Sequence, residues 1–183
     1  MYKEKVEAIK REIYSLMPNM APDDVFYELQ NSLLSEQMVH MMGILLGKHL
    51  NLKFIGSGVS RATYLLDDNT VIKLFIGADE TDNYQHDHEI KNLIYANEHN
   101  IQYAPKLYYY DEYCIIMEYI PNPYQASYCQ PITDAITSLK LEGFDTDYDD
   151  IHYCQNWRYK DDINQPYLID WGTTLLKEEI KSF

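Results

Sequence analysis

The chain has 183 residues and a mass of 21.6 kDa, which suits one domain or one domain with an appendage. Its residues are 46% hydrophobic and 24% charged, so it can bury a core, and no apolar run approaches the roughly 20 residues that a membrane span needs. Fifteen basic and 29 acidic side chains give a formal net charge of −14, which disfavours direct binding to nucleic acid or to an anionic membrane.

The N-terminal segment lacks the continuous apolar stretch of a secretory signal. The three cysteines, Cys114, Cys129 and Cys154, are an odd number and form no CxxC pair. This argues against a disulfide framework and against a structural zinc site, as does the lack of HxxxH or HExxH spacing among the six histidines. A cytoplasmic location is therefore expected.

Two helices are predicted in the first 48 residues. The first carries an apolar stripe at three- and four-residue spacing, made of Tyr2, Val6, Ile9, Ile13 and Leu16, and Pro18 and Pro22 end it. The second is expected to start at Asp23 or Asp24 and to end near Gly47. Its apolar face is predicted to comprise Phe26, Leu29, Leu33, Met38, Met41, Met42 and Leu45. The methionines could form a partner-binding groove, but core packing is the favoured interpretation.

From residue 51 onward the pattern predicts short strands. Gly56-Ser57-Gly58 and Asp67-Asp68-Asn69 are turn sequences between them. A helix is predicted over 83–97 and another over 132–141, and loop-and-strand pieces are expected around 150–157 and 167–172. The strands before these pieces are expected at 52–55, 63–66, 71–75, 106–110 and 114–119.

Three features of this region suggest chemistry. Gly56-Ser57-Gly58 would let backbone N–H groups approach a polyphosphate, although a plain hairpin turn is the commoner use of this pattern. Lys73 lies in an otherwise apolar strand, where a lysine either reaches solvent or has an anionic partner. Glu89 on the following helix could supply that partner; alternatively both residues are ordinary surface charges.

Taken together, the motifs resemble those of the protein-kinase-like superfamily, in the style of compact phage or bacterial kinase-like proteins and aminoglycoside-phosphotransferase-type folds. The resemblance covers about residues 51–175. The matching segments, in order, are Gly56-Ser57-Gly58-Val59-Ser60-Arg61, Val71-Ile72-Lys73, Glu89, Ile116-Met117-Glu118-Tyr119-Ile120, Asp150-Ile151-His152 to Asn156, and Asp170-Trp171-Gly172.

The resemblance implies an α+β protein-kinase-like fold. It would consist of an N-terminal helical extension (1–50), an N-lobe with a five-stranded antiparallel sheet (51–120), and a truncated C-lobe (121–183). Because thirteen residues of the given sequence follow Asp170, from Trp171 to Phe183, no counterpart of the kinase helices that bind peptide substrates is expected here.

The resemblance also implies a site for ATP. Backbone groups of Gly56, Ser57 and Gly58 would cover the phosphates, with Ser60 and Arg61 close enough to add contacts. Lys73 would hold the α- and β-phosphates and be positioned by Glu89. The adenine would be read by the Glu118 carbonyl and the Ile120 N–H, with Met117 limiting the depth of the pocket.

Catalytic and metal-binding roles follow from the last two motifs. Asn156 and Asp170 would hold Mg²⁺, and Asp150 would accept or orient the proton of the attacking hydroxyl. Two departures from the kinase pattern stand out: Arg61 replaces the third loop glycine, and Asp150 and Asn156 are one position further apart than in HRDxxxxN. His152 fits the Asp-x-His pattern of small-molecule phosphotransferases, where it is usually structural.

The expected function is ATP- and Mg²⁺-dependent phosphoryl transfer to a hydroxyl acceptor, on a protein or a small molecule. One alternative is a catalytically inactive pseudokinase that binds a nucleotide or a protein partner. Another is a kinase-fold adenylyltransferase.

Overall fold

A computed structural model describes residues 1–16, 18–20, 36–76, 80–125, 129–146, 149–172 and 175–176. The chain divides into two compact units. The first comprises Met1–Tyr84 and Tyr108–Tyr119, and the second comprises Gln85–Leu107 and Ile120–Phe183.

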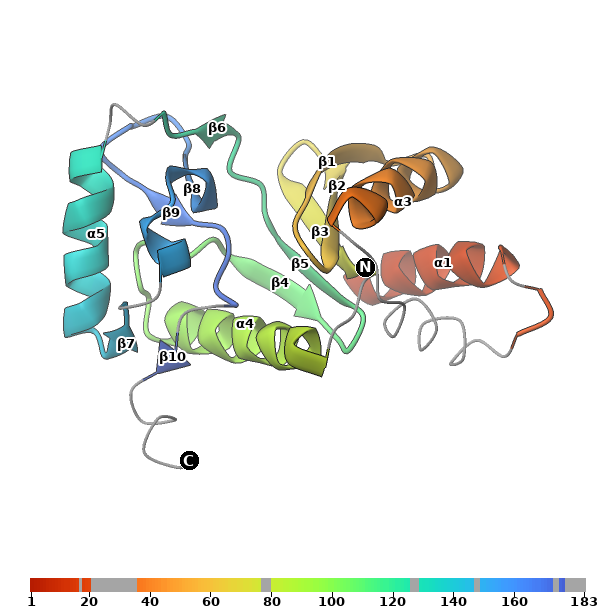
Figure 1. Ribbon diagram of the computed structural model, residues 1–183, viewed down its shortest axis with the longest axis horizontal. Coiled ribbons are helices and arrows are strands. Elements are labelled where there is room, and N and C mark those ends of the chain that lie inside the picture. Colours follow the sequence, from red (N-terminus) through yellow and green to blue (C-terminus); the bar gives the residue numbers. More distant parts are fainter. Residues whose placement is uncertain are drawn as a thin grey trace. The chain divides into compact units, whose positions relative to one another are not determined.

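The first unit is built on a five-stranded antiparallel sheet, which confirms the predicted α+β class (Figure 1). Its spatial order is β1-β2-β3-β5-β4. The strands are β1 (Lys53–Ser57), β2 (Arg61–Asp67), β3 (Thr70–Phe75), β4 (Leu107–Tyr110) and β5 (Cys114–Glu118). The β2–β3 turn has the predicted chemistry, because the Asn69 N–H donates to Asp67 Oδ1 over 3.1 Å.

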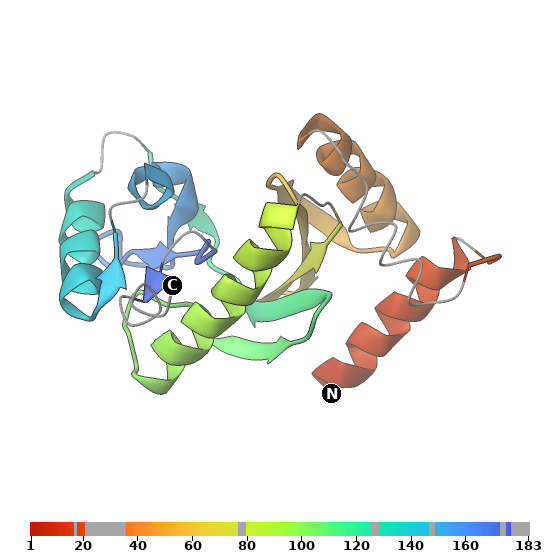
Figure 2. The same ribbon diagram turned by 60° about the horizontal axis from the view of Figure 1, so that its bottom comes forward.

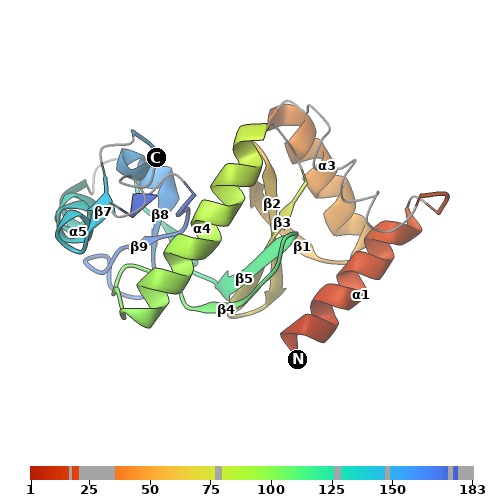
Figure 3. The same cartoon turned by 90° about the horizontal axis from the view of Figure 1, so that it is seen from below.

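Two N-terminal helices, α1 (Tyr2–Ser15) and α3 (Glu36–His49), lie on the same side of this sheet (Figure 3). They pack on side chains that alternate along the strands, as a pleated sheet requires. The buried cluster that joins helices and sheet contains Val6, Ile13, Val39, Leu46, Ala62, Tyr64, Ile72, Leu74, Ile76, Cys114 and Ile116. The stripe predicted for the first helix is therefore correct, except that Leu16 lies just beyond the helix and is 49% exposed.

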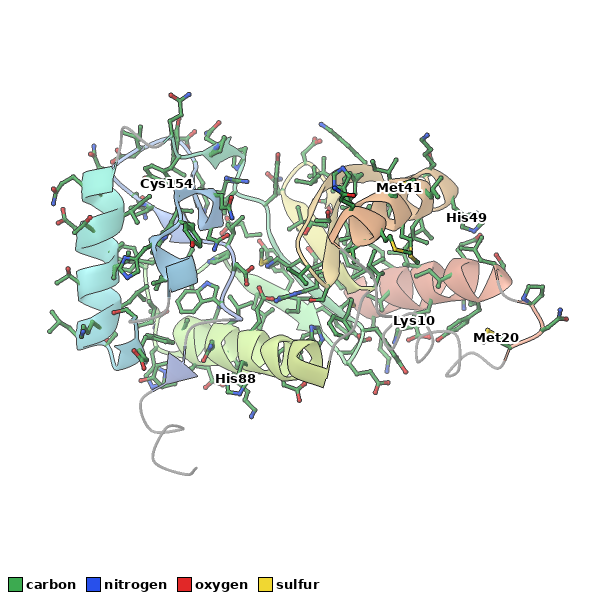
Figure 4. The ribbon with its side chains drawn as sticks, in the orientation of Figure 1. Lys10, Met20, Met41, His49, His88 and Cys154 are labelled. Atoms are coloured by element: carbon green, nitrogen blue, oxygen red, sulfur yellow. The ribbon has the colours of Figure 1, made fainter. Side chains whose placement is uncertain are left out.

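The predicted apolar face of the second helix was wrong at three positions. Met38, Met41 and Leu45 are 50%, 64% and 62% exposed, and Met41 is labelled on α3 in Figure 4. The buried side of α3 instead carries Val39 and Leu46, with Met42 partly buried against the same cluster. Gly43 and Gly47 lie on the same side and permit close contact with the sheet. The side of α3 that faces the sheet is therefore rotated about the helix axis relative to the predicted side. Phe26, Leu29, Leu33 and the predicted start at Asp23 or Asp24 lie outside the described residues.

The predicted end of this helix also needs correction. Gly47 lies inside α3, which continues to His49. Asn51 then adopts a left-handed conformation with φ of 53°, and the Leu52 N–H donates to the Gly47 carbonyl over 2.9 Å. Asparagine tolerates this conformation better than most residues, so Asn51 can end the helix in the conformation that glycine often adopts there.

The second unit contains most of α4 (Glu80–Glu98), which runs without a break in Figure 2, and α5 (Cys129–Leu141). Strands β6 (Asn122–Pro123), β8 (Trp157–Tyr159) and β9 (Tyr167–Leu168) form one antiparallel sheet. Strands β7 (Phe144–Asp145) and β10 (Leu175–Leu176) form another. Two short 3-10 helices, η1 (Asp149–His152) and η2 (Cys154–Asn156), precede β8.

Aromatic residues form much of the core of this second unit. Trp157, Trp171 and Phe144 are completely buried, and the rings of Phe144 and Trp171 meet edge to face with centroids 5.2 Å apart. Each indole N–H reaches a backbone carbonyl: Trp157 donates to Ile151 over 2.7 Å, and Trp171 donates to Leu168 over 2.8 Å. Buried tryptophans with satisfied N–H groups can anchor the short loops between them.

Within the described part of the chain, no helix combines the length and the apolar character needed to cross a bilayer. Cys114 and Cys154 are free thiols.

Candidate functional site

Lys73 lies on the face of the sheet opposite to the one covered by α1 and α3. Its neighbours Ile72 and Leu74 point into the cluster beneath the helices, so the alternation of the strand places Lys73 on the other side. Its cross-strand neighbours there are Thr63 on β2 and Ile115 on β5. The lysine is only 7% exposed, which excludes the interpretation that it is a solvated edge residue.

Gly56 and Gly58 lie at the end of β1 and in the turn to β2. Neither has a positive φ, and a Cβ added to either would meet no atom within 4 Å. Backbone conformation and packing within the described residues therefore do not explain these glycines. The open space over their Cα atoms is what close approach of an anionic group would need.

Ser60 and Arg61 complete this turn and are 3% and 8% exposed. The backbone closes around them, because the Gly58 N–H donates to the Arg61 carbonyl over 2.9 Å and the Ile76 N–H donates to the Ser60 carbonyl over 3.0 Å. Arg61 is the first residue of β2. The segment after Gly58 is thus tied to the end of β3, and Gly56 and Ser57 pair with β2. What is open at this end of the hairpin is the space over the Cα atoms of Gly56 and Gly58.

The segment predicted to read the adenine ends β5 and leads out of the first unit. Met117 is 3% exposed and pairs in register with Val71, while Glu118 pairs with Thr70. The Tyr119 N–H donates to the Asn69 carbonyl over 2.8 Å, which attaches this segment to the β2–β3 turn. Ile120 is 4% exposed and is the first residue of this segment in the second unit.

Glu89 belongs to α4 in the second unit and is completely buried. Asn92 follows one helical turn later on the same side and is also completely buried. The Asn92 side chain donates to the Trp171 carbonyl over 2.9 Å. The helix side that carries Glu89 is thereby attached to the Asp170-Trp171-Gly172 segment.

Asp150 lies in η1, and the residue after it is firmly anchored. Ile151 is 2% exposed, and its carbonyl accepts the hydrogen bond from the Trp157 indole. His152 is exposed, and its Nε2 lies 3.1 Å from the Thr146 carbonyl, which fits the structural role expected for it. Of the neighbouring acids, Asp147 lies outside the described residues.

Asn156 and Asp170 lie at the same end of one strand pair. Trp157 pairs with Leu168, and the Ile169 N–H extends this ladder by donating to the Asn156 carbonyl over 2.8 Å. Asp170 follows directly, and its Oδ1 accepts the Gly172 N–H over 3.2 Å. Both side chains are partly exposed. The hydrogen bond from the Ile169 N–H places the backbone of Asn156 opposite Ile169, the residue before Asp170.

The donor set suits magnesium better than zinc. Among the described residues, no three histidine, cysteine, aspartate or glutamate side chains gather as a metal site. One carboxylate and one amide oxygen are a small set of hard ligands, and Mg²⁺ takes such a set because water and substrate phosphates complete its coordination. His86 and His88 on α4 are each 3% exposed and form no such cluster; His88 is labelled in Figure 4.

One contact at the glycine turn was not predicted from the sequence. His40 on α3 approaches Ser57, with 3.0 Å between His40 Nδ1 and Ser57 Oγ. A sequence signal exists in hindsight, because His40, Gly43 and Gly47 share one side of a helix. Both residues belong to the first unit, as do Lys73 and the turn, whereas Glu89, Asp150, Asn156 and Asp170 belong to the second.

No protein-family model and no curated protein sequence matches the chain. Solved structures do match it. A structure of WbdD with the kinase inhibitor LY294002 is 17% identical, with a TM-score of 0.48 over 69% of this chain and 34% of that one. A second structure, described as the bifunctional kinase-methyltransferase WbdD, is 17% identical, with a TM-score of 0.46 over 68% and 33%. The chain therefore spans about a third of the WbdD chains.

A further match is the ternary complex of APH(2″)-IIa with streptomycin and ATP. It is 13% identical, with a TM-score of 0.42 over 73% of this chain and 70% of that one.

Proposed function

We propose that this chain is a kinase-like phosphotransferase that uses ATP and Mg²⁺ to phosphorylate a hydroxyl group. The acceptor class, protein or small molecule, stays open. The proposal rests on the residues of each unit, taken separately, and on the order in which their motifs follow one another along the chain.

The observation that carries the proposal is the hydrogen bond from the Ile169 N–H to the Asn156 carbonyl. It brings a catalytic-loop-like asparagine and the aspartate of Asp170-Trp171-Gly172 to one end of a strand pair, although fourteen positions separate them in the sequence. In protein kinases an asparagine and an aspartate from these two motifs hold the metal ions.

Each residue then has a defined task. Asn156 and Asp170 would hold the metal, which when bound neutralises charge on the transferring phosphoryl group. The space over Gly56 and Gly58 would admit phosphate oxygens. The ammonium group of Lys73 would hold them together with backbone N–H groups of the turn other than that of Gly58, which donates to the Arg61 carbonyl. Asp150 would orient the acceptor hydroxyl and take its proton. Phosphoryl transfer depends mainly on such positioning and electrostatics.

Nucleotide binding is tested first. Wild-type protein should be stabilised against thermal unfolding by ATP with Mg²⁺, because a ligand that binds only the folded state raises its stability. Lys73→Met should weaken ATP affinity at least tenfold. The control is Lys53→Met, which removes an exposed lysine at the start of β1 and should leave affinity unchanged. Equal affinity of wild type and Lys73→Met would contradict the role of Lys73.

Catalysis is tested with labelled ATP. Transfer of label from γ-labelled but not α-labelled ATP would support phosphoryl transfer, whereas the reverse would identify an adenylyltransferase. Asp170→Asn should abolish transfer, and Asp161→Asn, an exposed aspartate in the β8–β9 connection, should retain it. Binding without transfer to any hydroxyl acceptor would indicate a pseudokinase.

A further inference from the structure

Helix α3 approaches the sheet unusually closely through two glycines. A Cβ added to Gly43 would lie 2.7 Å from Phe54 Cε2 and 3.1 Å from Ala62 Cβ. A Cβ added to Gly47 would lie 3.0 Å from Tyr64 Cε1 and 3.1 Å from the Leu52 carbonyl oxygen. Real Cβ atoms essentially never approach as closely as the first of these distances, so glycine is required for this packing.

A buried hydrogen bond holds the helix in this place. The Tyr64 hydroxyl donates to the Gly43 carbonyl over 2.9 Å, and Tyr64 is completely buried. Burial raises the pKa of Tyr64, so the hydroxyl stays protonated and remains a donor. The position of α3 over β1 and β2, the two strands that flank the glycine turn, is therefore well determined.

His40 precedes Gly43 by one helical turn, on the same side of α3. Its ring meets the Phe54 ring edge to face, with centroids 5.2 Å apart, and its Nδ1 lies 3.0 Å from Ser57 Oγ. Ser57 is the last residue of β1 and stands between the two open glycines. A side chain from the N-terminal helical region thus contacts the middle residue of the turn.

We propose that His40 is a positioning residue of the phosphate-binding turn, acting through Ser57, so that the N-terminal helices are part of the nucleotide site. This inference rests on the proposed function, since it assigns His40 to the same nucleotide. Gly56 and Ser57 pair with β2 at the end of the hairpin, but a glycine on either side of Ser57 gives this end more conformations than other residues would. Ordering it further opposes binding. A turn already held by the His40–Ser57 hydrogen bond loses less conformational freedom when phosphates bind.

The exposure of the His40–Ser57 hydrogen bond indicates that it contributes to the turn more than to the stability of the fold. Both side chains are accessible to solvent, and an accessible hydrogen bond contributes little to the stability of a protein. The packing of α3 depends instead on Gly43, Gly47 and Tyr64. Loss of the imidazole should therefore affect the phosphates of a ligand more than the stability of the fold.

The test measures affinity for Mg·ATP and for adenosine in His40→Ala, Ser57→Ala and the double variant. Each single variant should weaken Mg·ATP binding by about 3- to 10-fold, as the loss of one hydrogen bond predicts. Adenosine, which has no phosphate, should bind unchanged. The double variant should be no weaker than either single variant, because the two side chains act through one bond. His40→Asn, whose amide can replace Nδ1, should retain most of the affinity.

The control is Gln37→Ala, an exposed residue of the same helix, which should behave as wild type in both assays. Hydrogen exchange supplies a readout without nucleotide: amides of residues 54–60 should exchange faster in Ser57→Ala, which keeps the contact between the His40 and Phe54 rings, at an unchanged melting temperature. If wild type binds Mg·ATP but the variants lose affinity for adenosine equally, or lose none, the role of His40 is disproved while the proposed function stands. If wild type binds no ATP, both proposals fall.

Discussion

At the scale of single residues, one largely buried ion pair adds to the apolar packing that attaches α1 to the sheet. Lys10 Nζ lies 2.8 Å from Asp111 Oδ2, and the two side chains are 12% and 20% exposed. Lys10, labelled in Figure 4, also lies over the Tyr113 ring, 4.6 Å from its centroid. Asp111 Oδ1 accepts the backbone N–H groups of Tyr113 and Cys114 over 2.9 and 3.0 Å. One carboxylate therefore orders the β4–β5 turn and binds the helix.

We predict that Lys10→Met lowers the free energy of unfolding by about 2 kcal/mol, because it leaves a largely buried carboxylate without its cation. The matched control is Lys5→Met on the same helix. Lys5 pairs with Asp67 over 3.5 Å, with both side chains more than 40% exposed, so its loss should cost less than about 0.5 kcal/mol. Equal effects of the two changes in urea unfolding would show that burial does not distinguish the pairs.

The same pair predicts a pH dependence. Burial acts to raise the pKa of Asp111, but hydrogen bonds from Lys10 and from the Tyr113 N–H outweigh it and hold this pKa below its ordinary value. Burial acts to lower the pKa of Lys10, yet Asp111 raises it to about 12. A carboxylate with a lowered pKa stabilises the fold above its unfolded-state pKa and loses this effect as the pH falls through the folded-state value.

The stability difference between wild type and Lys10→Met should accordingly be constant from about pH 5 to pH 9 and should shrink below about pH 4. Denaturant titrations at a series of pH values measure it. A difference that persisted undiminished at pH 2 would contradict the assignment of the effect to the Asp111 carboxylate.

At the scale of elements, the position of α3 close against the sheet depends on its two interior glycines, Gly43 and Gly47. Two glycines in its interior lower its intrinsic helix propensity, each by about 1 kcal/mol relative to alanine. Their effect on packing is opposite, since the missing Cβ atoms admit Phe54 and Tyr64.

We predict that Gly43→Ala destabilises the protein by about 1–3 kcal/mol, because overpacking against Phe54 and Ala62 exceeds the gain in helix propensity. At the exposed position Gln37 of the same helix, substitution by alanine should change stability by less than about 0.5 kcal/mol. Thermal or urea unfolding measures both. A stabilised Gly43→Ala would mean that the Phe54 ring moves aside without cost.

At the scale of the whole molecule, the net charge of −14 sets a condition on the proposed ligand. Free ATP is itself strongly anionic, so a surplus of acidic side chains repels it. We predict that chelation of magnesium weakens ATP binding at least tenfold in calorimetry, and that Asp170→Asn is much less sensitive to chelation than wild type. Equal affinity with and without magnesium would contradict the roles of Asn156 and Asp170 as metal ligands.

Much of the fold followed from local patterns. The five strands of the larger sheet, the long helix and their order were predicted to within a few residues, because alternation, helical spacing and turn residues are properties of neighbouring positions. The short strands β6, β7 and β10 were not predicted. The motif order that suggested a phosphotransferase is likewise readable along the chain. The backbone pairing of Asn156 with the residue before Asp170 could not be predicted from the sequence. It depends on the register of a short strand pair, which local patterns do not determine.

Local order could be deduced from the amino acids alone: which segments are helices and strands, and that Lys73 and Glu89 are unusual charges among apolar neighbours. Only the tertiary structure decided which side of α3 is buried, exposing Met38 and Met41, and that His40 reaches Ser57. The physical reason is that burial and close approach depend on the partner surface. A glycine allows close contact only where another surface, here the sheet, lies against it.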